Sequence, residues 1–170
     1  MVPPIVSVVS KKGSGKTTLL ERLIPELRRR GYRTGTVKHD THGFDIDHEG
    51  KDTWRHKQSG ASTVVISSPW KLSLIKDVDQ ELDLDQIVAT YFSDVDLVLT
   101  EGYSRAGKPQ VEVVRRSAHA QPLHQKGAPN HLFAVLSDTP VDLGVPNFDI
   151  DAVADLADLI VKLFLPVRGG

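Results

Sequence analysis

Residues 5–20, IVSVVSKKGSGKTTLL, decide the fold that the sequence predicts. The apolar run from Ile5 to Val9 predicts a short buried strand, and the glycine-containing turn after it leads directly into a helical pattern. A strand, a glycine-containing turn and a Lys-Thr pair in this order are typical of a phosphate-binding loop. A chance turn rich in Gly, Ser and Lys is the alternative, but such a turn does not require this order of elements.

The residue types of this loop suit a phosphate chain. Gly13 and Gly15 carry no Cβ, so backbone N–H groups can approach phosphate oxygens. Lys16 adds a charge for the β- and γ-phosphates, and Thr17 offers a hydroxyl to Mg²⁺, next to the dipole and free N–H groups of the helix N-terminus. The pattern GxxxxGK(S/T) has glycine where this chain has Ser10. The predicted nucleotide-binding residues of the loop are Lys12, Gly13, Ser14, Gly15, Lys16, Thr17 and Thr18.

Length and composition predict one domain over residues 1–170. A hydrophobic share of 39% and a charged share of 25% are ordinary for a globular protein with one core. With 21 basic and 22 acidic residues the formal net charge is -1, so no overall field favours nucleic acid or an anionic membrane as a partner. The chain has no cysteine, no apolar run of membrane-spanning length and no basic leader, so we expect a cytoplasmic protein.

The chain alternates between strand and helix patterns. The expected strands cover residues 5–9, 34–39, 62–67, 72–75, 96–100, 110–114 and 131–136. The expected helices cover residues 16–30, 51–59, 84–92 and 151–165. This order predicts an α/β fold of three layers, like that of P-loop NTPases, with a mainly parallel sheet and helices on both faces. Ligands bind such sheets at the carboxyl ends of the strands, where residues 10–15, residues 40–50, Glu101 and Asp138 are expected.

Acidic residues at this edge are candidate metal and catalytic groups. Glu101 ends a buried strand pattern, where P-loop proteins hold Mg²⁺ with a carboxylate, so Glu101 and Thr17 form the predicted magnesium site. Asp45 and Asp47 project to one side of an extended segment; Asp45 is a further candidate ligand, and either can orient a water at the γ-phosphate. The candidate catalytic residues are Lys16, Asp45, Asp47 and Glu101. An acidic turn residue at position 101 and a solvated loop at 45–47 are the alternatives.

Basic residues around the second strand are candidates for binding anions. An arginine can hold a phosphate or a pterin anion with two parallel hydrogen bonds, which lysine cannot. The candidates are Lys38, His39, Lys51 and Arg55. Zinc held by the histidines at positions 39, 42, 48 and 56 is an alternative that their spacing does not favour, because it matches no tetrahedral framework.

Two further residues keep two interpretations each. Asp138 closes an apolar strand and can accept hydrogen bonds from N1–H and the 2-amino group of guanine, but a turn aspartate explains it equally well, and the N-K-x-D signature is absent. Lys11 stands five residues before Lys16, where a dimeric class of nucleotide-binding proteins places a lysine that reaches the partner's phosphates. A solvated loop lysine is favoured over that role.

The segment KHDTHGFDIDHEGKDTWRHKQSGA at residues 38–61 resembles the molybdopterin-guanine dinucleotide biosynthesis protein B (MobB) family. The matching positions are Lys38, His39, His42, Phe44, Asp45, Asp47, Gly50, Lys51, Asp52, Arg55, His56, Gly60 and Ala61, with Ser59 in place of an alanine. The loop SKKGSGKTTLL, the strand end LTEGY at 99–103 and KPQVEVVR at 108–115 match as well. The resemblance therefore covers nearly the whole chain.

The resemblance implies a GTP-binding protein with weak Mg²⁺-dependent GTPase activity. It implies an accessory role beside the guanylyltransferase MobA, which joins GMP to molybdopterin, and a homodimer in which strands or loops of the two subunits meet. Molybdopterin itself is a further candidate ligand. Two alternatives stay open: a P-loop kinase acting on a small molecule, and a nucleotide-loaded binding module that does not hydrolyse its nucleotide.

Overall fold

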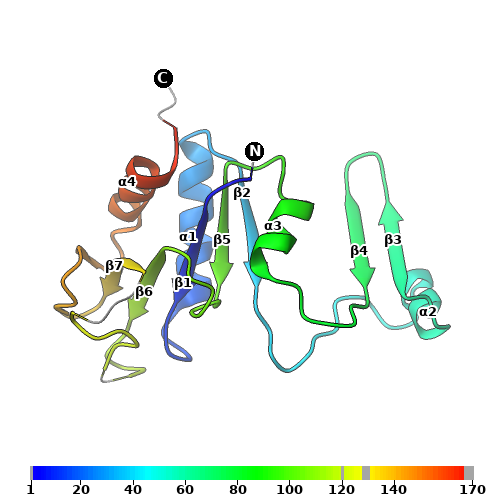
Figure 1. The fold of residues 1–170 in the computed structure, drawn as a ribbon, viewed down its shortest axis with the longest axis horizontal. Coiled ribbons are helices and arrows are strands. Elements are labelled where there is room, and N and C mark those ends of the chain that lie inside the picture. The colour runs from blue at the N-terminus through cyan, green and yellow to red at the C-terminus, as the bar shows by residue number, and fades with distance from the viewer. Residues whose placement is uncertain (1, 120, 128–130, 167–170) are drawn as a thin grey trace. The chain divides into compact units, whose positions relative to one another are not determined.

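Six parallel strands form the central sheet, in the order β2-β5-β1-β6-β7-β8 (Figure 1). The computed structural model describes residues 2–119, 121–127 and 131–166. The strands are β1 (Ile5–Val9), β2 (Thr34–Lys38), β5 (Leu97–Glu101), β6 (Gln110–Val114), β7 (Leu132–Ser137) and β8 (Asn147–Asp149). The predicted parallel sheet is confirmed, but β8 was missed, because its three residues NFD carry too few apolar positions to form a recognisable pattern.

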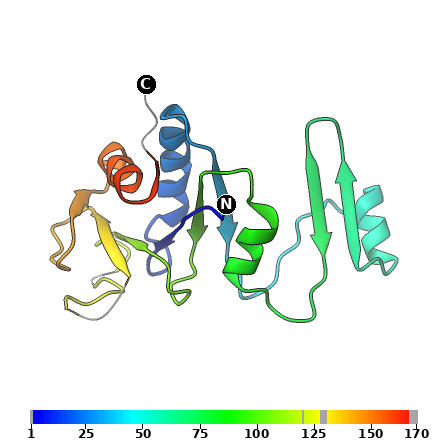
Figure 2. The same cartoon turned by 45° about the horizontal axis from the view of Figure 1, so that its top comes forward.

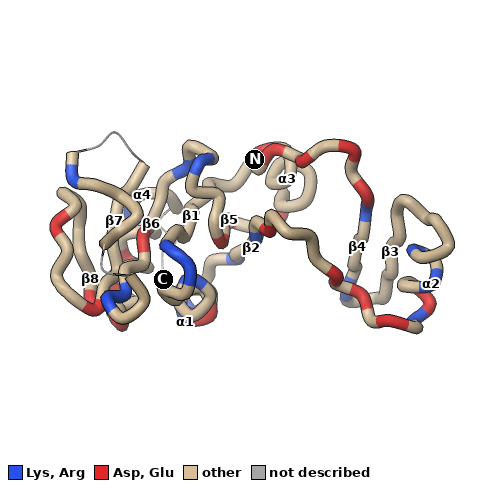
Figure 3. Tube along the Cα trace, turned by 90° about the horizontal axis from the view of Figure 1, so that it is seen from below, with Lys and Arg blue, Asp and Glu red and all other residues tan. Residues whose placement is uncertain are grey.

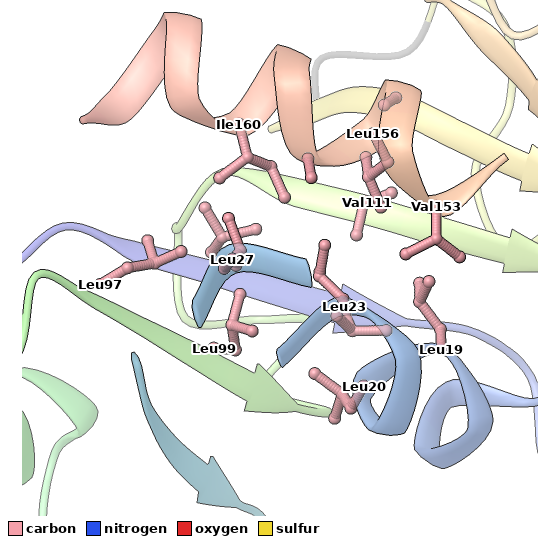
Figure 4. Packing of buried hydrophobic residues seen from close by; sticks show 14 of the residues in the cluster. Leu19, Leu20, Leu23, Leu27, Leu97, Leu99, Val111, Val153, Leu156 and Ile160 are labelled. Carbon is pink, nitrogen blue, oxygen red and sulfur yellow. The ribbon is translucent and has the colours of Figure 1, made fainter. Parts of the chain in front are cut away.

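Helices cover both faces of this sheet, as the three-layer prediction requires. Helices α1 (Lys16–Arg29) and α4 (Val153–Phe164) pack on one face, where Leu23 and Leu27 of α1 and Ile160 of α4 are fully buried (Figure 4). Helix α3 (Leu84–Tyr91) packs on the other face. Alternate residues of β1 and β5 therefore enter different core clusters, since side chains along a strand point to opposite faces.

Helix α1 lies between two glycines with positive φ angles. Gly15, with φ of 99°, precedes the helix, and Gly31, with φ of 85°, follows its last turn. The N–H groups of Gly31 and Tyr32 donate to the carbonyls of Arg28 and Leu27, a Schellman arrangement that uses two of the last free carbonyls. Gly31 therefore ends this helix.

Residues Asp40–Asp83 form a second compact unit, and the rest of the chain forms the first. The second unit holds α2 (Asp52–Gln58) and an antiparallel hairpin of β3 (Thr63–Ser67) and β4 (Leu72–Lys76). Figure 2 shows α2 beside β3, and Val64 of β3 is buried in this unit. Both strands were predicted, but their pairing in a separate sheet was not. The prediction of a single domain stays a prediction.

No helix in the described part of the chain is both long enough and apolar enough to span a membrane. Figure 3 shows acidic and basic residues along the whole trace, with acidic residues gathered on the segment between β4 and α3. The expectations that the protein has no nucleic-acid partner and no membrane partner stay predictions.

Candidate functional site

The loop between β1 and α1 has the backbone expected of a phosphate-binding loop. We call residues 10–15 the glycine loop. Gly13 and Gly15 have φ of 81° and 99°, in the left-handed region that side chains disfavour. Ser14 is buried, and α1 begins at Lys16, directly after Gly15. The free N–H groups of the first turn of α1 are therefore presented where the loop ends.

Ser10, the first residue of the glycine loop, is hydrogen-bonded to Lys16, the first residue of α1. The Nζ of Lys16 donates to Oγ of Ser10 over 3.1 Å, and this Oγ donates to the carbonyl of Lys11 over 2.7 Å. The hydroxyl that replaces the first glycine of the motif therefore orients the ammonium of Lys16.

The two predicted magnesium ligands lie in contact. Thr17 Oγ1 donates to Glu101 Oε2 over 3.0 Å, although the two residues are 84 positions apart in the sequence. Glu101 is the last residue of β5, which pairs with β1, so its side chain projects beside the glycine loop. Lys38 Nζ lies 3.9 Å from the other oxygen of the same carboxylate. A hydroxyl and a carboxylate are the hard oxygen donors that Mg²⁺ prefers, so these residues fit the predicted ion.

Hydrogen bonds next to Thr17 and Glu101 hold the ends of β1, β2 and β5 together. Thr100 donates to the buried hydroxyl of Ser7 over 2.9 Å, which joins β5 to β1. The N–H of His39 donates to the carbonyl of Glu101 over 3.1 Å, and the His39 ring lies 4.8 Å from the ring of Tyr103. The predicted candidates Lys38 and His39 therefore lie at the same edge as Glu101.

Asp138 follows β7 at the same edge of the sheet, two strands from β1. Its Oδ1 accepts a hydrogen bond of 2.9 Å from the backbone N–H of Arg116. Asp138 also lines a pocket of about 330 Å³ between the ends of β7 and β8. Its lining residues are Ser137, Asp138, Thr139, Pro140, Asn147, Phe148 and Asp149. The contribution of β8 to this pocket was not predicted.

The remaining predicted site residues belong to the second unit. Asp45 and Asp47 both line a pocket of about 430 Å³ inside this unit, together with Trp54. Oδ1 of Asp47 accepts from the N–H of His48 over 2.8 Å, while Oδ2 is buried without a hydrogen-bond partner among the described residues. The predicted approach of Asp45 and Asp47 to the magnesium pair stays a prediction.

Lys51 is the residue before the first turn of α2, and Arg55 lies in the last turn of this helix. Both side chains are exposed. The predicted roles of Lys51 and Arg55 as anion contacts stay predictions. Among the described residues, no group of three or more His, Asp or Glu side chains lies close enough to hold a metal ion, so the zinc alternative gains no support.

Arg115 was not predicted as a site residue, yet it lies against the glycine loop. A Cβ added to Gly15 would lie 3.7 Å from Nη2 and 3.9 Å from Nε of Arg115. His119 Nε2 lies 2.6 Å from the carbonyl of Lys12, in the same loop. The signal was present in the sequence, because Arg115 is the first charged residue after the apolar end of β6, which pairs with β1.

Comparisons with known proteins agree with this arrangement. The family model "Molybdopterin guanine dinucleotide synthesis protein B" matches residues 5–138. The molybdopterin-guanine dinucleotide biosynthesis adapter protein of Escherichia coli (strain K12) is 35% identical over 162 residues, which cover 94% of this chain and 92% of that protein. The adapter protein of Haemophilus influenzae is 32% identical over 158 residues, covering 92% and 87%.

Solved structures resemble nearly the whole chain. A structure of molybdopterin-guanine biosynthesis protein B has a TM-score of 0.74 at 39% identity and covers 94% of this chain and 99% of its own. Bacillus subtilis MobB has a TM-score of 0.74 at 27% identity, covering 98% and 99%. The predicted fold class, a P-loop NTPase-like α/β fold, is therefore confirmed. The match over residues 5–138 and the identities to the relatives show that this chain belongs to the molybdopterin guanine dinucleotide synthesis protein B (MobB) family.

Proposed function

We propose that this protein binds Mg²⁺-GTP, hydrolyses it slowly and acts as an adapter when GMP is attached to molybdopterin in the cytoplasm. The observation that carries the proposal is the hydrogen bond between Thr17 and Glu101 beside the glycine loop. This contact joins the hydroxyl at the start of α1 to a carboxylate from the neighbouring strand. Such a pair is needed where a triphosphate and its metal ion are bound together.

The glycine loop and α1 supply the groups for the phosphates. Backbone N–H groups of residues 13–17 point donors at the anion, and the helix dipole favours negative charge at the same place. Lys16 brings a full positive charge within reach of the β- and γ-phosphates, after exchanging Ser10 for a phosphate oxygen. When bound, Mg²⁺ supplies charge neutralisation, and Thr17 and Glu101 would hold it.

The pocket at the ends of β7 and β8 is the proposed binding site for guanine. Adjacent strands lie about 4.8 Å apart, so the end of β7 is about 10 Å from the end of β1, two strands away. A nucleotide whose phosphates occupy the glycine loop can span this distance. Asp138 would accept from N1–H and the 2-amino group of guanine, donors that adenine does not offer as a pair.

We propose Asp45 and Asp47 as groups that orient water or the metal ion. Phosphoryl transfer to water needs positioning and charge neutralisation rather than covalent chemistry. Lys38, His39, Lys51 and Arg55 are proposed as contacts to phosphate or to the pterin anion of molybdopterin.

Relatives of this chain support the adapter role, since the proteins of Escherichia coli and Haemophilus influenzae carry that name. We propose a MobA-type guanylyltransferase and further molybdenum-cofactor proteins as partners, and a homodimer as the active assembly. One face of the hairpin carries Val65, Leu72 and Leu74, which are 52%, 67% and 36% exposed. An apolar face of this kind is typical of a surface that another chain covers, and a second copy is the proposed occupant.

Calorimetric titration with GTP, GDP and ATP in the presence of Mg²⁺ tests the nucleotide proposal. We expect GTP to bind more tightly than ATP and Lys16→Ala to weaken GTP binding about 10- to 100-fold, the effect of one charge-assisted hydrogen bond. Lys162→Ala, which removes an exposed lysine of α4, is the matched control. Equal GTP affinities of Lys16→Ala and wild type would refute the proposal.

Labelled GTP separates hydrolysis from the two alternatives. Release of γ-phosphate as inorganic phosphate supports a GTPase, and its appearance on a metabolite supports a kinase. A nucleotide-loaded module that does not hydrolyse GTP would stimulate the guanylyltransferase equally with GTP and with a non-hydrolysable analogue.

A further inference from the structure

Arg115 differs from the other described arginines in its surroundings. It is half-buried, and its guanidinium makes no hydrogen bond or ion pair with any described residue. Arg30, the other half-buried arginine, donates to Glu26 and Asp158. The remaining described arginines are exposed. Removing a guanidinium from water without an anionic partner is unfavourable, so the position of Arg115 suits an anion that the chain itself does not supply.

The guanidinium lies against the last residue of the glycine loop. Nη2 and Nε form one edge of the fork, and both lie within 4 Å of the position that a Cβ on Gly15 would take. These are ordinary van der Waals distances, so the Arg115 side chain packs directly beside the backbone of the loop. This edge of an arginine can bind phosphate with two parallel hydrogen bonds.

A short turn holds Arg115 in this place. The carbonyl of Arg115 accepts hydrogen bonds of 3.0 Å from the N–H groups of Ala118 and His119. His119 Nε2 then contacts the carbonyl of Lys12 over 2.6 Å, with the ring nitrogen as donor. Residues 115–119 therefore lie against the glycine loop at both ends, which fixes the backbone of Arg115 beside the loop before any ligand binds.

We propose that Arg115 binds the α- and β-phosphates of the nucleotide, an inference that rests on the proposed function. The order of the strands assigns these phosphates. Glu101 follows β5 on one side of β1 and marks the metal end, while Asp138 follows β7 and marks the base end. Arg115 follows β6, between β1 and β7, so it meets the part of the nucleotide that GDP and GTP share.

The test compares GDP, Mg²⁺-GTP and pyrophosphate as ligands of wild type, Arg115→Ala and Arg115→Lys. We expect Arg115→Ala to weaken all three by the same factor, about 10- to 100-fold, since each loses the same charge-assisted hydrogen bonds. Arg115→Lys restores the charge but not the fork, so it recovers only part of the loss. Arg28→Ala removes an exposed arginine of α1 and leaves all three affinities unchanged.

Three results would overturn the proposal: unchanged affinities in Arg115→Ala, a loss confined to GTP, or full recovery by Arg115→Lys. Thermal unfolding of each variant establishes that the fold is retained.

Titration with pyrophosphate and the variant Lys16→Ala together distinguish a failure of this inference from a failure of the proposed function. If wild type binds pyrophosphate through Lys16 but does not bind GTP, the guanine proposal fails while Arg115 is still judged on pyrophosphate. If GTP binds through Lys16 and Arg115→Ala has no effect, only Arg115 fails.

Discussion

Lys16 and Ser10 are joined by a hydrogen bond of 3.1 Å between Nζ and Oγ, across the mouth of the glycine loop. In the motif GxxxxGK(S/T) the position of Ser10 is a glycine, which has no side chain to offer this bond. The departure from the motif therefore acts on the very lysine that is proposed to reach the phosphates. Nucleotide binding has to replace the Ser10 hydroxyl as the acceptor of Lys16.

Ser10→Ala removes this competing acceptor. We expect it to raise GTP affinity about 3- to 10-fold. The hydrogen bond stabilises the nucleotide-free protein by about 1 kcal/mol, and nucleotide binding has to break it. Calorimetric titration with Mg²⁺-GTP measures the change, and Ser68→Ala, a substitution in the turn between β3 and β4, is the control. A lower affinity in Ser10→Ala would mean that the hydroxyl contacts the phosphates instead.

Glu101→Gln tests the proposed magnesium site. The amide keeps an oxygen that can accept from Thr17 but loses the negative charge that a divalent cation requires. GTP affinity in Mg²⁺ should fall about 10-fold, while the affinity measured with a chelator should not fall. A variant whose GTP affinity still rises with Mg²⁺ as in wild type would exclude Glu101 as a metal ligand.

Glu26 gives the first unit a defined pH dependence. Hydrogen bonds from Arg29 and Arg30 lower the pKa of Glu26 from 4.5 to about 2. The folded form therefore binds this proton more weakly than the unfolded form, so its stabilising effect is complete above pH 4.5 and is lost as the pH falls towards 2.

Urea unfolding of wild type and Glu26→Gln at pH 7, 4 and 2 measures this effect. Wild type should be the more stable protein at pH 7, and the difference in the free energy of unfolding should shrink below pH 4.5. Glu21→Gln, an exposed carboxylate on the same helix, should show no comparable difference. A difference that stayed constant from pH 7 to pH 2 would contradict the assignment.

The dimer proposed on the apolar face of the hairpin can be tested by substitution. Replacing Leu72 and Leu74 together by serine should weaken dimerisation by about 3 kcal/mol, or roughly 100-fold, if a second copy buries them. Sedimentation velocity at several protein concentrations measures the shift, and Val78→Ser, an exposed residue outside the hairpin strands, is the control. A wild-type protein that stays monomeric at all concentrations would rule out the dimer.

The sequence by itself determined the local features of this protein. The apolar run of β1, the glycine loop and the Lys-Thr pair are contiguous, so residues 5–20 carry their own structure in a short pattern. The same holds for the strand that ends at Glu101. The motif at residues 38–61 identified the family.

Only the tertiary structure decided which of these features meet. Arg115 reaches Gly15 because β6 pairs with β1, and Glu101 reaches Thr17 because β5 pairs with the other side of β1. Strand order depends on contacts between residues far apart in the chain, which no local periodicity encodes. For the same reason the sequence predicted β3 and β4 but not their separate sheet, since a strand pattern states that a segment is extended and not which segment it pairs with.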